Sequence, residues 1–315
     1  MTGRVYLDHA ASSPLHPAAR DSVIRAFELA GNPSSVHAEG RAARALLEAA
    51  RRTVRQAIGA GDAGVLVFTS GATEANAMAL RTSGQALASA VEHPSVLAQP
   101  GVAALPVDGA GRLDLGALEA RLVGGEVRVV ALMLANNETG VVQSVAEAAR
   151  LAHAAGARLH VDAVQALGKL PVDVEALGCD SLALSAHKLG GPKGVGALWL
   201  RDPDVVPPLL HGGGQEARRR AGTENVPGIA GFAAALEALA AAAPARLAAL
   251  RRELEAALPS LAPDAVVIAA DTDRAPHIVA LALPGLPAAT QVMALDLDGI
   301  AVSAGAACSS GKVGR

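Results

Sequence analysis

Short apolar runs alternate with amphipathic helical patterns along the chain between about residues 40 and 200. Apolar runs of this length, bounded by polar or glycine-containing segments, predict strands. The predicted strands cover residues 65–68, 127–134, 158–161, 181–184 and 195–200. The run over 127–134 is almost continuously apolar, as expected for a strand that is covered on both faces. With predicted helices at residues 73–80 and 145–154, the pattern indicates an α/β fold with a mostly parallel sheet.

The composition shifts toward alanine and leucine in the last third of the chain. Residues 228–258 predict a long helical linker that is interrupted at Pro244, because proline breaks the helical hydrogen-bond pattern. The elements predicted beyond this linker are two strands and one helix, at residues 265–270, 277–283 and 287–297. The sequence therefore predicts a large domain followed by a smaller one.

Composition narrows the classes of function. Of the 315 residues, 51% are hydrophobic and 18% are charged, which is typical of a globular protein with a large core. The formal net charge is −3 and only 2% of the residues are aromatic. Binding to nucleic acid through a basic surface needs an excess of positive charge, and stacking on bases needs aromatic rings. We therefore expect no nucleic-acid partner.

The sequence also gives no sign of a membrane or secretory protein. The longest charge-free stretch, residues 275–295, contains Pro276, Pro284 and Pro287, which would break a spanning helix. The first residues, MTGRVYLDH, include no apolar signal core. Two cysteines do not form a disulfide framework. We expect a cytoplasmic enzyme without membrane contact.

Polar, glycine-containing segments follow the predicted strands. In open α/β sheets, chemistry gathers in the loops beyond the carboxyl ends of the strands. Because several such segments would converge at one edge of the sheet, together they favour a functional site more than any one of them does. These segments are residues 69–74, 92–94, 136–140, 162–165, 185–188 and 211–216.

Three of these segments each have a functional and an ordinary interpretation. Residues 69–73 join a strand to a helix N-terminus, which predicts either a phosphate site or a plain capped turn. Asp162 ends an apolar strand, where a carboxylate either caps a helix or pairs with a protonated pyridine nitrogen. Lys188 lies beside His187 and two glycines, which suits a lysine that bonds covalently to a cofactor. The ordinary interpretation of Lys188 is a solvated surface lysine.

Eight segments match, in order, the motifs of one family: YLDHAASSP, FTSGATEAN, EHPSV, NNETG, HVDAVQALGK, SAHKLGGPKGVGAL, HGGGQE and RAGTENV. Together they resemble the NifS/IscS-like cysteine desulfurases, which are pyridoxal 5′-phosphate (PLP) enzymes of the class V aminotransferase family. The resemblance extends over almost the whole chain. It implies the PLP-dependent transferase fold type I, with a large domain built on a mostly parallel seven-stranded sheet and a smaller α+β domain. Residues 15–240 would form the large PLP-binding domain, and residues 1–14 with 241–315 the small domain.

The resemblance implies roles for individual residues. Lys188 would hold PLP covalently, Asp162 would pair with the pyridine nitrogen, and His93 would stack on the ring and move protons. Gln165 would bond the phenolic oxygen, with Asn137 beside it. The residues implied at the phosphate are Ala72, Thr73, Ser185 and His187, together with Thr223 from the second subunit of a homodimer. No metal site is implied.

Cys308 distinguishes sulfur chemistry from transamination within this resemblance. It lies among small residues in AGAACSSG, residues 304–311, a composition typical of a loop. A lone cysteine is often a small buried side chain, and this is our interpretation of Cys179. Cys308 matches the family's nucleophile, whose thiolate takes sulfur from L-cysteine as a persulfide and leaves L-alanine. The persulfide would pass to an acceptor such as an Fe–S scaffold protein.

The C-terminus departs from the family pattern. Family members continue into a helix and a strand that carry an arginine for the substrate carboxylate, and no residue here matches that arginine. We therefore expect either that the sequence is incomplete or that the small domain is truncated at its C-terminus. Two alternatives stay open: a selenocysteine lyase or another class V PLP aminotransferase, and a catalytically impaired desulfurase-like subunit.

Overall fold

The fold is described from a computed structural model covering residues 3–81, 84–239 and 243–305. Cys308 therefore lies outside the described residues. Among the residues described, the largest sheet has seven strands in the order β2-β8-β7-β6-β5-β3-β4. Their bounds are β2 Val65–Thr69, β3 Gln85–Ser89, β4 Val102–Leu105, β5 Val127–Met133, β6 Arg158–Asp162, β7 Ser181–Ser185 and β8 Gly196–Leu200.

The sheet is mostly parallel, as the sequence predicts. Neighbouring strands pair in parallel along the part of the sheet that runs β4-β3-β5-β6-β7. Strand β8 is antiparallel to both of its neighbours, β2 and β7. Five of the strands coincide with predicted runs. Strands β3 and β4 were not predicted, because their sequences QALAS and VAAL are rich in alanine, a residue with weak strand preference.

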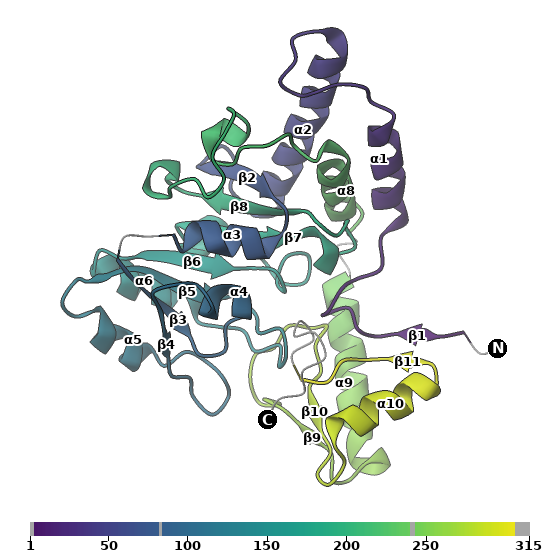
Figure 1. Ribbon diagram of the computed structural model, residues 1–315. Coiled ribbons are helices and arrows are strands. Elements are labelled where there is room, and N and C mark those ends of the chain that lie inside the picture. The colour runs from purple at the N-terminus through teal and green to yellow at the C-terminus, as the bar shows by residue number, and fades with distance from the viewer. Residues whose placement is uncertain (1–2, 82–83, 240–242, 306–315) are drawn as a thin grey trace.

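Helices cover both faces of this sheet (Figure 1). Alternate residues of one strand point to opposite faces. In β5, Val130 and Leu132 belong to the main core cluster, whereas Val129 and Ala131 pack into a second cluster with Val96. The near-continuous apolar run predicted for β5 is therefore explained by burial on both sides. The helices of this part are α1 Pro17–Phe27, α2 Ala38–Ala57, α3 Ala72–Ala79, α4 Pro94–Leu97, α5 Leu115–Leu122, α6 Val145–Ala154, α7 Val174–Leu177 and α8 Val226–Glu237.

The remaining elements lie together below the large sheet in Figure 1. They are β1 Val5–Tyr6, α9 Ala243–Leu261, β9 Val266–Val267, β10 Leu281–Ala282, α10 Ala288–Leu297 and β11 Ile300–Ala301. The N-terminal strand β1 pairs in parallel with β11, and β9 pairs with β10. Residues from both ends of the chain thus meet here. The two-domain division at residues 14 and 240 stays a prediction.

Two expected strands of this part are much shorter than the sequence suggests. The run 265–270 yields only β9, because Ala269 adopts a positive φ of 54° that ends the extended conformation. The run 277–283 yields only β10, because the Ile278 N–H bonds back to the Ala275 carbonyl in a turn. Within the described ranges, no helix is both long and apolar enough to cross a membrane.

Candidate active site

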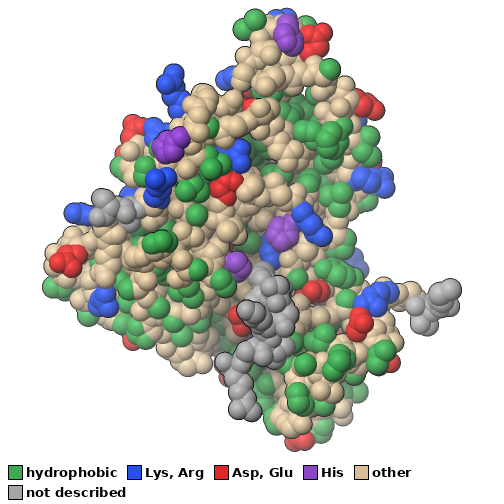
Figure 2. Space-filling model, viewed as in Figure 1, with side chains coloured by type: hydrophobic (Ala, Val, Ile, Leu, Met, Phe, Trp, Pro, Cys, Tyr) green, Lys and Arg blue, Asp and Glu red, His purple; other side chains and the backbone are tan. Residues whose placement is uncertain are grey.

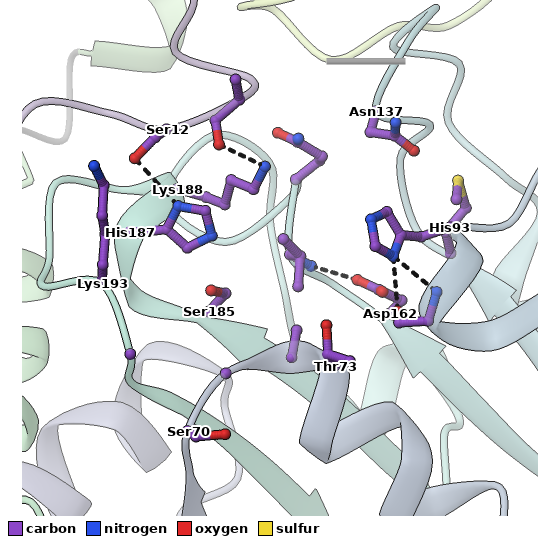
Figure 3. Close-up of a pocket in the computed structure, with 18 of the residues that line it drawn as sticks. Ser12, Ser70, Thr73, His93, Asn137, Asp162, Ser185, His187, Lys188 and Lys193 are labelled. Carbon is purple, nitrogen blue, oxygen red and sulfur yellow. Dashed lines mark hydrogen bonds between the residues drawn. The ribbon is translucent and has the colours of Figure 1, made fainter. Parts of the chain in front are cut away.

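A cavity of about 590 Å³ opens where β2, β5, β6 and β7 end (Figure 3). Figure 2 shows histidine and basic side chains on the surface between the elements of the large sheet and the part that holds α9 and α10. Nine of the residues singled out in the sequence line this cavity, which brings together five of the six polar segments expected to converge. They are Ala72, Thr73, His93, Asn137, Asp162, Gln165, Ser185, His187 and Lys188.

One end of the cavity is suited to an anion. Helix α3 begins after Gly71, and no side chain of the described residues caps its first N–H groups. Free N–H groups and the helix dipole both favour negative charge at this end. The hydroxyls of Thr73 and Ser185 line the same region (Figure 3). Strand β8 approaches this turn closely, since a Cβ on Gly196 would lie 2.6 Å from the Gly71 carbonyl carbon.

Lys188 lies in the 3₁₀ turn that follows β7, and it is buried. Its Nζ donates to the backbone carbonyls of Ala10, at 2.6 Å, and Ala11, at 2.9 Å. Ser12 Oγ lies 3.2 Å from His187 Nδ1. The N-terminal segment therefore forms one wall around the lysine. No site role was predicted for these residues, although their motif YLDHAASSP carries part of the family resemblance.

Basic side chains lie close to Lys188 and to its neighbour His187. Lys169 Nζ donates to the Lys188 carbonyl at 2.8 Å. Burial, reinforced by the charge of Lys188, lowers the pKa of Lys169 to about 7. Burial and the nearby Lys188, Lys193 and Lys169 likewise lower the pKa of His187 to about 4. His187 is therefore neutral at physiological pH, and the cations favour an anion at this end of the cavity.

Asp162 and His93 face the cavity on the opposite side from Lys193 (Figure 3). Asp162 ends β6, and its Oδ1 accepts a hydrogen bond from the Val164 N–H at 3.0 Å. His93 precedes α4, and its Nδ1 accepts from the Ser95 N–H at 3.0 Å. A carboxylate, an imidazole and an amine thus open into one enclosed space.

Gln165 connects this site to the C-terminal part of the chain. Its Nε2 donates to the Ala10 carbonyl at 2.9 Å, and its Oε1 lies 3.2 Å from His277 Nε2. Burial, followed by the charges of Lys169, His9 and Lys188, lowers the pKa of His277 to about 2. Neutral His277 therefore donates to Gln165. No sequence signal that we used pointed to His277.

Glu92 is a buried carboxyl group behind the site. Its Oε1 accepts from Ser89 Oγ at 2.7 Å and from the Met133 N–H at 2.8 Å. Burial outweighs these hydrogen bonds and, with the nearby charge of Asp162, raises the pKa of Glu92 to about 8. Glu92 is therefore largely protonated at neutral pH.

Glu92→Gln is expected to remove a pH-dependent loss of stability. The folded protein retains a proton on Glu92 between its ordinary pKa, 4.5, and about 8, whereas the unfolded chain releases it. The stabilisation that protonated Glu92 contributes to the folded wild type is therefore complete below about pH 4.5. It decreases as the pH rises and is lost once the pH passes about 8. Between about pH 5 and 8, the free energy of unfolding of the wild type should fall relative to the variant by up to about 4 kcal/mol. Urea denaturation of both cofactor-free proteins across this range measures the difference, and a pH-independent difference would contradict the assignment.

Two predicted residues do not join the nine in the main cavity. Thr223 lines a second cavity of about 220 Å³, which shares Ser70 and Gly194 with the first. Cys308 lies outside the described residues. The burial predicted for Cys179 is confirmed: it is 0% exposed, and burial raises the pKa of its thiol to about 12.

The family model for "Aminotransferase class-V" matches residues 5–313. The chain belongs to this family. A cysteine desulfurase of Cereibacter sphaeroides is 45% identical over an alignment of 327 positions, gaps included, that covers 98% of this chain and 84% of that protein. This similarity places the chain among the cysteine desulfurases of the class V family.

Solved structures give the same relationship. A NifS-like protein from Rickettsia africae superposes with a TM-score of 0.91 at 31% identity, covering 99% of this chain and 91% of that one. A structure of SspA in complex with cysteine superposes with a TM-score of 0.83 at 27% identity, covering 95% of this chain and 88% of that one. The class V fold expected from the sequence is thereby confirmed.

Proposed function

We propose that this chain is a PLP-dependent cysteine desulfurase that converts L-cysteine to L-alanine and retains the sulfur as a persulfide. The observation that carries the proposal is the arrangement of Lys188, Asp162 and the uncapped start of α3 around one cavity. PLP has an aldehyde, a pyridine nitrogen and a phosphate, which an amine, a carboxylate and a helix N-terminus can each bind. The residues present therefore fit the cofactor.

Each side of the cavity has a part in holding PLP. Lys188 would bond it covalently, and Asp162 would pair with the ring nitrogen. Gln165 has a second amide hydrogen beyond the one given to Ala10, and that hydrogen is available for the phenolic oxygen. The His93 ring and Asn137 would lie beside the cofactor and substrate. Ala72, Thr73, Ser185 and His187 would bind the phosphate.

When bound, PLP supplies an electron sink that stabilises negative charge at the substrate α-carbon. Lys188 Nζ would take the α-proton, because its amine is freed inside the cavity once the substrate amine has taken its place on the cofactor. Cys308, as a thiolate, attacks the substrate sulfur: the C–S bond of cysteine breaks and an S–S bond to Cys308 forms. Two protons returned to the carbon skeleton complete L-alanine: the α-proton held by Lys188 and, at the β-carbon, a proton equivalent to the one that the Cys308 thiol released. The atoms therefore balance without an external oxidant or reductant. The persulfide then passes to an acceptor protein, such as an Fe–S scaffold.

Product analysis distinguishes this function from transamination. Purified protein with PLP and L-cysteine, and with no keto acid, should form alanine over many turnovers when a thiol is present to remove the persulfide. Alanine and sulfide should appear in equal amounts. Turnover that requires a keto acid would instead identify an aminotransferase. Turnover of L-selenocysteine without turnover of L-cysteine would identify a selenocysteine lyase.

We also propose a homodimer in which Thr223 of one subunit completes the phosphate site of the other. Thr223 lines the cavity adjacent to the main one, and Arg220 in the same segment is held by Glu74 of α3 at 2.9 Å. After subunit exchange between Lys188→Ala and Thr223→Ala proteins, random pairing makes about a quarter of the sites intact. The absorption of lysine-bound PLP at limiting cofactor should therefore rise on mixing. No rise, or a monomer in sedimentation at working concentration, would refute the shared site.

A further inference from the structure

A buried polar network lies behind the cavity wall, on residues that the proposed reaction does not use. Asn76, in α3, and His160, in β6, are both 0% exposed. Asn76 Nδ2 lies 2.8 Å from Asp162 Oδ2 and 2.9 Å from Ser95 Oγ. Asn76 Oδ1 lies 2.9 Å from His160 Nε2. Both polar atoms of the Asn76 side chain therefore have partners at hydrogen-bond distance.

The carboxylate of Asp162 determines which way the Asn76 amide faces. In the reversed orientation, the amide oxygen would face the carboxylate oxygen, and two acceptors would repel each other. Nδ2 therefore donates its two hydrogens to Asp162 and Ser95. Oδ1 must then accept from His160 Nε2. Burial, with a smaller contribution from Arg158, lowers the pKa of His160 to about 3, so this ring is neutral.

Ser95 extends the network to His93. Its Oγ accepts from Asn76 and lies 2.8 Å from His93 Nδ1; it donates its own hydrogen to that nitrogen, because Nδ1 already accepts from a backbone N–H. The Ser95 backbone N–H donates to the same nitrogen at 3.0 Å, and both contacts are drawn as dashed lines at His93 in Figure 3. A ring nitrogen that accepts hydrogen bonds in this way carries no proton. The proton of neutral His93 is therefore on Nε2.

We propose that Asn76 and Ser95 are positioning residues, which through one hydrogen-bonded chain orient the Asp162 carboxylate and hold His93 as its neutral Nε2–H tautomer. This inference rests on the proposed function, because it concerns the residues assigned to the ring nitrogen and the ring face of the cofactor. With Nδ1 occupied and Nε2 protonated, His93 enters the reaction as a hydrogen donor. It does not take the α-proton, which is left to Lys188.

The tautomer of His93 can be measured without cofactor or substrate. In ¹⁵N NMR of cofactor-free protein labelled at histidine, the nitrogen chemical shifts distinguish protonated from bare ring nitrogens. Loss of one set of signals in His93→Gln identifies this residue. We expect a bare Nδ1 and a protonated Nε2 at neutral pH. A proton on Nδ1, or a doubly protonated ring, would overturn the proposal, whether or not the protein proves to be a desulfurase.

Two variants and a matched control test the positioning role. Asn76→Ala removes a hydrogen bond to a charged group and should weaken retention of PLP about 10- to 100-fold. Ser95→Ala leaves the Asn76–Asp162 contact in place, so PLP affinity should stay within about threefold while the His93 nitrogen shifts change. Ser181→Ala removes the contact of Ser181 Oγ with His160 Nδ1, 2.8 Å away at the far end of the network, and should change neither readout.

The pattern across the variants decides the proposal. Equal effects of all three substitutions on PLP retention would show a merely structural role and overturn it. Unchanged PLP retention in Asn76→Ala would also overturn it. Should Asn76→Ala fail to fold, the His93 shifts in Ser95→Ala carry the test, and unchanged shifts there would count against the proposal. If the wild type does not bind PLP, the proposed function is wrong. The tautomer measurement still tests the positioning role in that case, because it needs no cofactor.

Discussion

Replacing Lys188 with alanine is expected to abolish both covalent attachment of PLP and turnover of L-cysteine. Of the two lysines that line the described cavity, Lys188 is buried and Lys193 is exposed, and we assign to Lys188 the bond to the cofactor aldehyde and the transfer of the α-proton. Loss of proton transfer alone lowers rates by about 10²- to 10⁴-fold, and loss of attachment adds to it. The measurements are the visible absorption of reconstituted protein and alanine formation from L-cysteine.

Lys169→Ala serves as the control for this prediction. Lys169 contacts the Lys188 backbone but is not among the residues that line the described cavity, so its removal should leave the absorption of lysine-bound PLP in place. Borohydride reduction of the wild type, followed by peptide mass analysis, should find the cofactor on the peptide that contains Lys188. Label on a peptide that lacks Lys188 would show that the assignment is wrong.

Cys308→Ser is expected to separate cofactor chemistry from sulfur transfer. Lys188, Asp162 and the residues at the phosphate end are unchanged in this variant, so the absorption of bound PLP and its response to L-cysteine should persist. Sulfide release and persulfide formation should fall to background, because a serine hydroxyl cannot accept the sulfane sulfur as a thiolate does. The drop in sulfide release measures the effect.

Cys179→Ala is the matched control for Cys308→Ser. Cys179 is fully buried, and burial raises the pKa of its thiol to about 12, which keeps it protonated and unreactive. Its removal should cost stability through lost packing and leave turnover nearly unchanged. Normal sulfide release by Cys308→Ser would contradict the role assigned to Cys308. Loss of sulfide release in folded Cys179→Ala would contradict the packing role assigned to Cys179.

Strand prediction succeeded where the apolar signal was strong. The runs that became β2, β5, β6, β7 and β8 contain branched or large apolar residues packed in the core. The alanine-rich β3 and β4 lacked that signal, and they are recognised only through their pairing in the sheet. The short β9 and β10 show the opposite error, because backbone turns at Ala269 and Ile278 override apolar sequence.

The cavity could be predicted because its residues follow the predicted strands directly. Asp162 and Ser185 are the last residues of β6 and β7, so the parallel sheet brings them to one edge. The contacts of Asn76 and His277 could not be predicted in this way. Asn76 lies inside a helix, and His277 meets Gln165 across 112 residues of sequence. Only tertiary packing brings these side chains to the site.

Single-turnover sulfur tracing tests the central claim most directly. Wild-type protein reconstituted with PLP is mixed with ³⁴S-labelled L-cysteine, without keto acid and without any other added thiol. The product is trapped with an alkylating probe and digested for peptide mass analysis. We predict one ³⁴S persulfide on the Cys308 peptide for each alanine released. Alanine without labelled Cys308, labelled sulfur on Cys179, or no alanine at all from PLP-loaded protein would contradict the account.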